Sequence, residues 1–329
     1  PETKDFYAPY CKRNNVDEAH RLFFHYKMHY GNAAKNDIND IKDLAERTSF
    51  IKDAAVLYSR DIEQILPVDE MFVESYNERT ELGKEIAKDS KIVIVSLARD
   101  CGDISLQDSI NRVKSLCTYQ TSFFVYENDS KDGTKDILKN NNIECISHNL
   151  NLESLQDRSY TRTERLANYR NVCSEWVRDN HSDADYVIVL DLDADLGFSV
   201  DGIYNSIYWL NAIENAGCMG SYSLYHNNNN YVHYDSFAIR INDWKPSNES
   251  DYNNRWVRHW HPLVGSNPVQ MYSCFGGLGV YKTSAFLSGT YDGELGSEHV
   301  NFHKTMQESG WSMYLNPSSR FFSVFNKIK

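Results

Sequence analysis

The sequence lacks the long apolar runs of a membrane protein and the cysteine spacing of a zinc or disulfide protein. No segment of its 329 residues reaches the roughly 18 apolar residues that a bilayer-spanning helix needs, and no signal peptide is visible. The 7 cysteines are odd in number, scattered, and form no C-x-x-C pair. These absences argue against a zinc finger and a secreted disulfide framework, and they favour reduced thiols in the cytoplasm.

Positive charge is also scarce. Lysine and arginine total 34 against 46 aspartate and glutamate residues, which gives a formal net charge of −12. Since a nucleic-acid-binding protein usually has a basic balance or a dense basic stripe, we expect no nucleic-acid partner. Hydrophobic residues make up 41% of the chain and aromatic residues 13%. This composition supports a sizeable core and argues against wholesale disorder.

The N-terminal part of the chain has the hydrophobic pattern of helices. Within residues 1–88, apolar side chains recur at helical spacing, as in Leu22, Phe23 and Tyr26, and charged residues fill the other face. We expect a helical N-terminal segment that extends the protein or mediates its oligomerisation. A role in binding a membrane surface or an acceptor is the alternative.

From residue 89 onward the pattern becomes that of an α/β domain. Short β-branched runs such as KIVIVSLA and YVIVLD alternate with helical stretches. This alternation predicts βαβ units and a mainly parallel, Rossmann-like central sheet flanked by helices. After about residue 218 the loops lengthen and the strands become irregular, so we divide the predicted domain, 89–329, into halves at 89–217 and 218–329.

A cluster of aspartates directly follows the apolar run YVIVL. Asp191 and Asp193 are two residues apart, so in an extended chain their side chains share one side. Because hard carboxylate oxygens suit Mg²⁺ or Mn²⁺, we predict a divalent-cation site here. Two alternatives stay open: a phosphatase of the haloacid-dehalogenase type, which would use Asp191 for phosphoryl transfer, and a solvated acidic loop.

Several motifs in their chain order resemble those of the GT-A glycosyltransferases. They span roughly residues 90–325 and read VSLARD, YENDSKDGT, RLANYRN, DLDAD, and SCFGGLGVYK followed by SEHVNFH. The second string looks most like CAP59-type and related fungal and viral mannosyltransferase-like enzymes. The resemblance implies a GT-A fold with a nucleotide-sugar-binding first half and an acceptor-binding second half. It also implies a metal-dependent glycosyltransferase that uses Mn²⁺ or Mg²⁺.

The substrates follow from the same resemblance. It implies transfer of a sugar from a nucleoside-diphosphate sugar to a glycan or glycolipid acceptor, in surface polysaccharide or glycan synthesis. The donor nucleotide would lie over the ends of the first two predicted strands, near Ser96 and Arg99. Glu127 and Asp129 would then accept hydrogen bonds from ribose hydroxyls or a base N–H. A simple turn at Asp129 is the alternative.

Three residues on the predicted long helix are candidates for binding the donor diphosphate. Arg165 and Asn168 lie three apart and share a helix face, and Arg170 follows on the same helix. Arginine presents a planar fork that suits phosphate oxygens. A solvent-facing helix with no ligand is the alternative.

The second half supplies the candidate catalytic residues. Glu298 stands where inverting members of the superfamily place a catalytic base, and Asp235 is a candidate for bonding sugar hydroxyls. His303 resembles a third metal ligand beside Asp191 and Asp193, although a lone histidine is more often structural. The sequence leaves retention or inversion of the anomeric centre open.

The sequence leaves two further questions open: where the protein is located, and whether it belongs to a third class of function. We expect a cytoplasmic enzyme without a transmembrane segment, and peripheral contact with the inner face of a membrane is not decided. The oligomeric state is equally open. Because the chain holds 22 tyrosines and 6 tryptophans, a non-catalytic carbohydrate-binding module that stacks rings on sugars is a further alternative.

Overall fold

A computed structural model describes most of the chain after residue 61. The described residues are 62–102, 104–151, 160–192, 194, 197–227, 230–233, 235–241, 244 and 261–324. Most of the predicted helical segment 1–88, and Asp193 of the predicted metal site, therefore lie outside the described residues.

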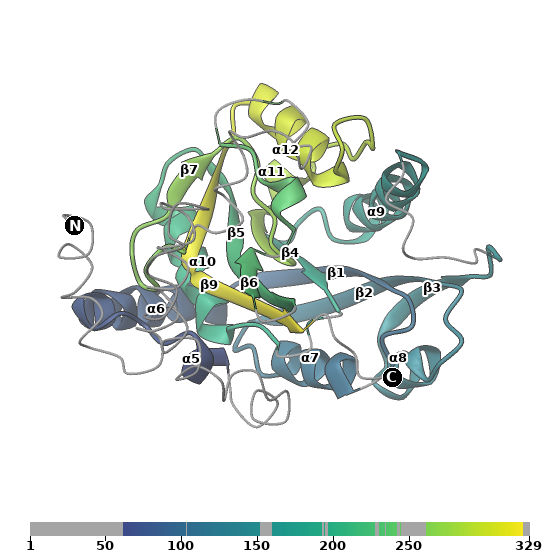
Figure 1. Ribbon diagram of the computed structural model, residues 1–329, viewed down its shortest axis with the longest axis horizontal. Coiled ribbons are helices and arrows are strands. Elements are labelled where there is room, and N and C mark those ends of the chain that lie inside the picture. Colours follow the sequence, from purple (N-terminus) through teal and green to yellow (C-terminus); the bar gives the residue numbers. More distant parts are fainter. Residues whose placement is uncertain are drawn as a thin grey trace, which may run out of the picture.

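The described residues form a mixed sheet with helices on both faces (Figure 1). The strands are β1 (Lys91–Ala98), β2 (Gln120–Asn128), β3 (Glu144–His148), β4 (Tyr186–Asp191), β5 (Ala216–Asn227), β6 (Asn230–His233), β7 (Val269–Met271), β8 (Leu278–Lys282) and β9 (Ser312–Val324). The helices are α5 (Ile62–Ile65), α6 (Val73–Lys88), α7 (Ile104–Lys114), α8 (Thr134–Asn140), α9 (Tyr160–Asn180), α10 (Val200–Ala212), α11 (Thr283–Phe286) and α12 (Glu298–Glu308), with short 3-10 turns η3 (Glu70–Phe72) and η4 (Ser236–Ala238).

The sheet has two halves with different strand directions. Its order is β3-β2-β1-β4-β8-β5-β9-β7, and β6 pairs with β5. Strands β3, β2, β1 and β4 are all parallel, whereas β8 runs antiparallel between β4 and β5. Parallel neighbours need crossover connections, which here contain α7, α8 and α9. The prediction of an α/β fold with a parallel sheet in its first half is confirmed.

Each face of the sheet contributes to a separate hydrophobic core. Along β1, Val93 and Val95 join the core beneath α9, α11 and α12, while Ile92 and Ile94 join the core that contains α7 and α10. Burial on both faces explains why the strand reads as a continuous apolar run instead of an alternating one. The ends of the parallel strands are thereby held rigidly, and the site described below is built on them.

Helix α6 packs directly on α10. A Cβ atom on Gly83 would lie 1.8 Å from the carbonyl oxygen of Tyr204, so only glycine permits this approach of the two backbones. The contact joins residues on either side of the boundary predicted at residues 88–89.

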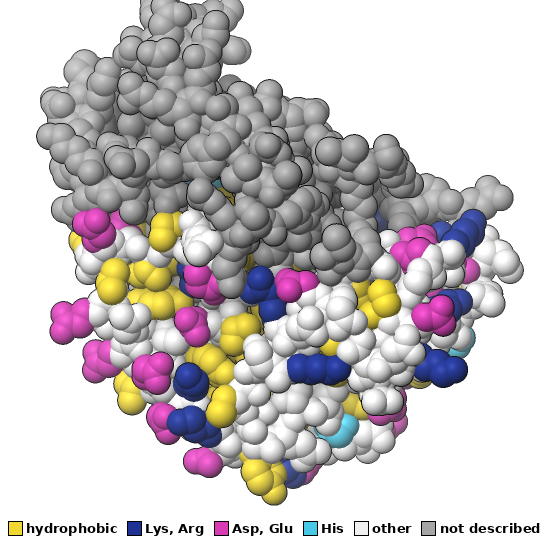
Figure 2. Space-filling view, turned by 90° about the horizontal axis from the view of Figure 1, so that it is seen from below, with side chains coloured by type: hydrophobic (Ala, Val, Ile, Leu, Met, Phe, Trp, Pro, Cys, Tyr) yellow, Lys and Arg dark blue, Asp and Glu magenta, His cyan; other side chains and the backbone are white. Residues whose placement is uncertain are grey.

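The surface seen from below in Figure 1 carries mixed charge. Figure 2 shows acidic and basic side chains interspersed over the described part of this face, with neither sign forming a continuous patch. No helix among the described residues combines the length and apolar character needed to cross a membrane.

Candidate active site

The carboxyl end of β4 brings several predicted site residues together. Asp191 ends this strand, and its backbone N–H donates to the carbonyl of Gly277 at 2.7 Å. Gly277 belongs to the glycine-rich stretch before β8, has a φ of 82°, and would place a Cβ 2.5 Å from the ring of Phe321. The glycine therefore lets this stretch pack tightly beside the end of β4 and fix the backbone of Asp191.

Arg170 on helix α9 connects Asp191 to Glu298. Its Nη2 donates to Asp191 Oδ1 at 3.0 Å, and its Nε donates to Glu298 Oε1 at 2.9 Å. The guanidinium also lies over the ring of Phe275, 5.4 Å from the ring centroid. The side chains of Arg170 and Glu298 are each 8% exposed and that of Asp191 is 18% exposed. A buried cation thus holds one carboxylate from each half of the chain.

The two carboxylates stabilise the charged form of Arg170. Burial opposes the charge of Arg170, but Asp191 and Glu298 outweigh it and raise the pKa of the guanidinium above its usual value. Because Nε and Nη2 are both committed to carboxylates, the predicted role of Arg170 in binding a diphosphate would need Nη1 or a rearrangement. Oε2 of Glu298 makes no hydrogen bond among the described residues, so this oxygen is open to further contacts, and the predicted catalytic role of Glu298 stays a prediction.

Asp235 is the third carboxyl group at this site. Burial raises its pKa well above the usual value, and the nearby charges of Glu298 and Asp191 raise it further, against the opposing effect of Arg170. Asp235 has a φ of 52°, in the left-handed region that non-glycine residues rarely adopt. Its side chain makes no hydrogen bond to cap the short η4 turn. A strained, locally unpaired carboxyl group of this kind is typical of functional sites.

The structure contradicts the prediction that His303 is a metal ligand. His303 is fully buried, its Nδ1 shares a hydrogen bond with Ser273 Oγ at 2.8 Å, and its Nε2 shares one with Tyr281 OH at 3.0 Å. Burial lowers the pKa of His303 to about 3, so it is neutral. With both ring nitrogens engaged by hydroxyl groups, neither can donate a lone pair to a cation in this arrangement.

His299, in contrast, lies beside the carboxylates. Its ring stacks on Phe275, with 3.6 Å between centroids, and its Nε2 is 3.6 Å from Glu298 Oε1. Neither ring nitrogen has a hydrogen-bond partner within the described part of the chain. Burial lowers its pKa well below the usual value, and Arg170 lowers it further. The ring therefore acts as a neutral wall of the site.

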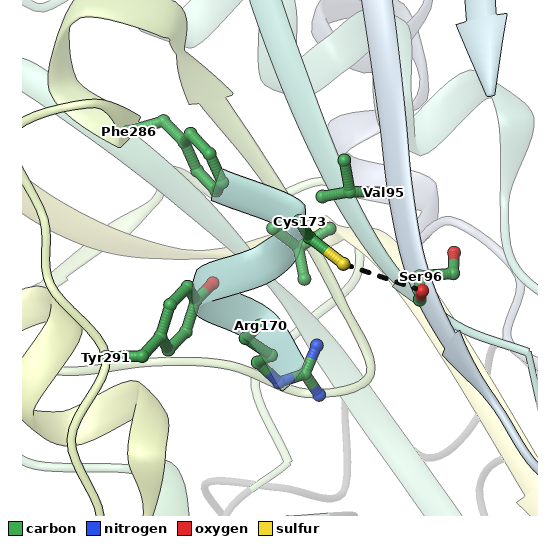
Figure 3. A pocket seen from close by; sticks show the side chains of 7 residues that line it. Val95, Ser96, Arg170, Cys173, Phe286 and Tyr291 are labelled. Carbon is green, nitrogen blue, oxygen red and sulfur yellow. Dashed lines mark hydrogen bonds between the residues drawn. The ribbon is translucent and has the colours of Figure 1, made fainter. Parts of the chain in front are cut away.

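Ser96 lies beneath the site and not at its surface. It lines a small void together with Val95, Arg170, Cys173, Val189, Phe286 and Tyr291 (Figure 3). The space is too small for a water molecule, and the Ser96 hydroxyl is buried without a hydrogen-bond partner. In this arrangement the hydroxyl cannot reach a bound nucleotide, which contradicts the prediction for Ser96.

A second group of predicted residues gathers at the carboxyl end of β2. Glu127 is fully buried, and its carboxylate accepts from Ser130 N at 2.8 Å and from the Ser147 hydroxyl. Asp129 Oδ1 accepts from the backbone N–H groups of Leu150 and Asn151 at 2.6 and 2.8 Å. Both carboxylates therefore organise the loops around them. Their predicted contact with ribose or base stays a prediction.

Sequence reasoning missed an aromatic pair at this second group. The rings of Tyr126 and Tyr169 stack with 4.6 Å between centroids. Burial raises the pKa of Tyr169, and the charges of Arg165, Asp129 and Arg99, three predicted donor-binding residues, also act on this phenol. Tyr169 stands between two singled-out residues in RLANYRN, which is the signal that could have identified it.

Asn168 remains apart from both groups. It is exposed on α9, and its side chain makes no hydrogen bond within the described part of the chain. Its predicted contact with a diphosphate therefore stays a prediction.

The carboxyl groups at the end of β4 supply the oxygen ligands that a divalent cation prefers. Arg170 bonds Asp191 and Glu298, and the charges of these two carboxylates add to burial in raising the pKa of Asp235, against the opposing effects of Arg170 and Arg162. A hard cation would relieve this repulsion. Within the described residues, no three histidine, cysteine or acidic side chains are already arranged to bind a metal ion. Asp193 lies outside those residues.

Three solved structures illustrate the similarities found. A Pyrobaculum calidifontis mannosyltransferase in complex with GDP-Man and Mn²⁺ has a TM-score of 0.45 and 11% identity, over 78% of this chain and 68% of that one. GalNAc-T7 with UDP, GalNAc and Mn²⁺ has a TM-score of 0.47 and 12% identity, over 79% of this chain and 54% of that one. S. aureus TarS 1-349 has a TM-score of 0.43 and 10% identity, over 71% of this chain and 60% of that one. At TM-scores below 0.5 these similarities carry no argument about function.

The α/β sheet flanked by helices is the class of fold that the sequence motifs predicted. Residues 91–316, more than half of the chain, match the family described as Cryptococcal mannosyltransferase 1, and the chain belongs to this family. The protein is therefore a glycosyltransferase, as the sequence motifs predicted. No significant match was found among curated proteins.

Proposed function

We propose that this protein is a metal-dependent enzyme that transfers a sugar from a nucleoside-diphosphate sugar to a glycan or glycolipid acceptor. The family description favours mannose as the sugar. The observation that carries the proposal is the group at the end of β4, where Arg170 joins Asp191 to Glu298 and Asp235 lies close by. A surface polysaccharide or other glycan is the proposed product, and the cytoplasmic location with peripheral membrane contact stays a prediction.

Asp191 and Asp193 would hold Mn²⁺ or Mg²⁺. The bound metal would supply positive charge that stabilises the leaving nucleoside diphosphate. Arg170 positions Asp191 and neutralises part of its charge, while His299 and Phe275 exclude water from one side of the carboxylates. Arg99 and Arg165, beside the Tyr126–Tyr169 stack, are proposed to bind the nucleotide or its phosphates.

Two carboxyl groups are available to act on the acceptor or the transferred sugar. Asp235, whose pKa is raised by burial and by the charges of Glu298 and Asp191, is a candidate to exchange a proton with a hydroxyl group. Glu298 retains one unbonded oxygen but spends the other on Arg170. We therefore propose that Asp235 contacts the reacting hydroxyl groups and that Glu298 shares this role only if the enzyme inverts.

The test is the double variant Asp191→Asn with Asp193→Asn. Calorimetry should show that Mn²⁺-dependent binding of GDP-mannose and UDP-sugars is lost, and mass spectrometry should show loss of sugar transfer. Asp183→Asn is the matched control, because Asp183 is an exposed aspartate near the opposite end of β4. Unchanged Mn²⁺-dependent nucleotide binding in the double variant would overturn the proposal. A trapped phospho-aspartate would favour phosphoryl transfer, and glycan binding with no nucleotide response would favour a binding module.

A further inference from the structure

A polar hollow lies at the amino ends of β1 and β2, on the face of the sheet that α9 covers. In the register of these strands, Lys91 pairs with Gln120 and Val93 pairs with Ser122. Because side chains alternate along a strand, these four lie on one face, and Val93 belongs to the core beneath α9. Helix α9 ends at Asn180, and between its end and the two strands lies a hollow of about 240 Å³.

Polar side chains that line this hollow are open to a ligand. Gln120, Ser122 and His181 line it, and their side chains make no hydrogen bond within the described part of the chain. Amide, hydroxyl and neutral imidazole groups can each donate and accept a hydrogen bond. Beside them, Lys91 forms an ion pair with Asp183, so these two charges compensate each other. The hollow therefore favours a neutral ligand that is rich in hydroxyl groups over an ion.

The wall of the hollow at the end of α9 is held in place by its own contacts. The ring of His181 packs against that of Trp176, with 4.6 Å between centroids, and the side chain of Asn180 donates to the Trp176 carbonyl at 2.9 Å. Trp176 in turn stacks on Phe124 of β2, with 4.6 Å between centroids, and its Nε1 donates to Glu144 Oε1 at 2.7 Å. A binding group that is fixed in advance loses less conformational entropy when a ligand binds.

The hollow is separate from the candidate active site. Asp191 pairs with Leu97, which lies six residues after Lys91 on β1. At roughly 3.3 Å per residue, this separation is about 20 Å. The hollow therefore lies at the opposite end of the strands from the residues that are predicted to bind the donor.

We propose that this hollow is a secondary binding site for one hexose unit of a glycan. Gln120, Ser122 and His181 hydrogen-bond the sugar hydroxyls. The volume is just below the roughly 300–1,000 Å³ of pockets that hold drug-sized ligands, which suits a single sugar ring. The inference rests on the proposed function in taking the glycan to be the acceptor. A glycan chain bound both here and at the active site would be retained more strongly than by either site alone.

Saturation-transfer NMR of the full chain with mannotriose, maltotriose and cellotriose, without Mn²⁺ or nucleotide, tests the site. The double variant Gln120→Ala with Ser122→Ala removes two hydrogen-bonding groups. Thr121→Ala is the matched control, because Thr121 lies between them on β2 and its side chain points to the opposite face. A second variant, Ser122→Tyr, places a ring in the hollow at a strand position, where tyrosine is well tolerated.

The wild-type protein should bind at least one of the trisaccharides. The double variant should weaken that binding about tenfold, Ser122→Tyr should abolish it, and Thr121→Ala should leave it unchanged. Melting temperatures close to that of the wild type verify that each variant is folded. Absence of trisaccharide binding by the wild type, or equal binding by the wild type and the double variant, would overturn the secondary site.

The proposed function is judged separately, by Mn²⁺-dependent nucleotide binding to the wild-type protein. If the wild type binds a trisaccharide through the hollow but binds no nucleotide, the proposed function fails and the secondary site stands. If it binds nucleotide but no trisaccharide, the secondary site fails and the proposed function stands.

Discussion

Replacing Arg170 with methionine should destabilise the metal-free protein and enlarge the effect of Mn²⁺ on it. In the wild-type protein, Arg170 bonds Asp191 at 3.0 Å and Glu298 at 2.9 Å with its side chain almost fully buried. Arg170→Met leaves both carboxylates without their cation. Removing one partner of a buried ion pair costs about 3–5 kcal/mol, because the remaining charge is left uncompensated.

The size of the expected effect follows from this cost. In a domain of this size each kcal/mol lowers the melting temperature by about 2–4 °C, so the metal-free variant should melt roughly 10 °C lower. A bound Mn²⁺ would then compensate the carboxylates that Arg170 neutralised. We therefore expect saturating Mn²⁺ to raise the melting temperature of Arg170→Met by several degrees more than that of the wild type.

The assay is a thermal-shift titration with Mn²⁺ at constant ionic strength. Arg79→Met is the control, because Arg79 is another buried arginine, but its hydrogen bond goes to the backbone carbonyl of Gly265 at 2.5 Å. Arg79→Met should lower the melting temperature and show the wild-type response to Mn²⁺. If Arg170→Met also shows the wild-type response, Arg170 does not neutralise the charge that the cation would meet, and the reasoning fails.

Two further predictions concern titration. Burial, Glu298 and Asp191 raise the pKa of Asp235 in the folded state, so the folded protein holds this proton more tightly and loses stability as the pH rises above 3.8. Asp235→Asn removes this carboxyl group. The melting temperature of the variant should therefore fall less with rising pH than that of the wild type. An unchanged pH profile would refute this. His303→Gln should keep wild-type Mn²⁺ affinity in calorimetry and lose less stability between pH 6.5 and 3, because burial lowers the pKa of His303 to about 3. A large loss of Mn²⁺ affinity would restore His303 as a ligand.

The first half of the fold could be predicted from the sequence because its signals are local. The strands β1 and β4 are short β-branched runs buried on both faces, and the helices between the strands carry apolar residues at helical spacing. The second half was harder. Strand β9 includes Pro317 and a run of serines, and its pairing with β5 changes register between Ser221 and Tyr222. A strand interrupted in this way has no regular alternation to detect.

The site could be predicted only in part for a related reason. The position of Asp191 at the end of a buried strand is visible in ten residues of sequence. The pairing of Arg170 with Glu298 spans 128 residues, and it depends on how α9 and α12 meet over the sheet. Such contacts follow from the tertiary arrangement and leave no local pattern.

The error over His303 has a different cause, which helical geometry could have exposed. Glu298 and His303 were both assigned to the site, yet both lie on α12. An α-helix turns by about 100° per residue, so side chains five positions apart point roughly 140° away from each other. Once Glu298 faces Arg170, His303 must face elsewhere, and it lies in the core between Ser273 and Tyr281. His299, the next residue on α12, is the histidine found beside the carboxylates, with its Nε2 3.6 Å from Glu298 Oε1.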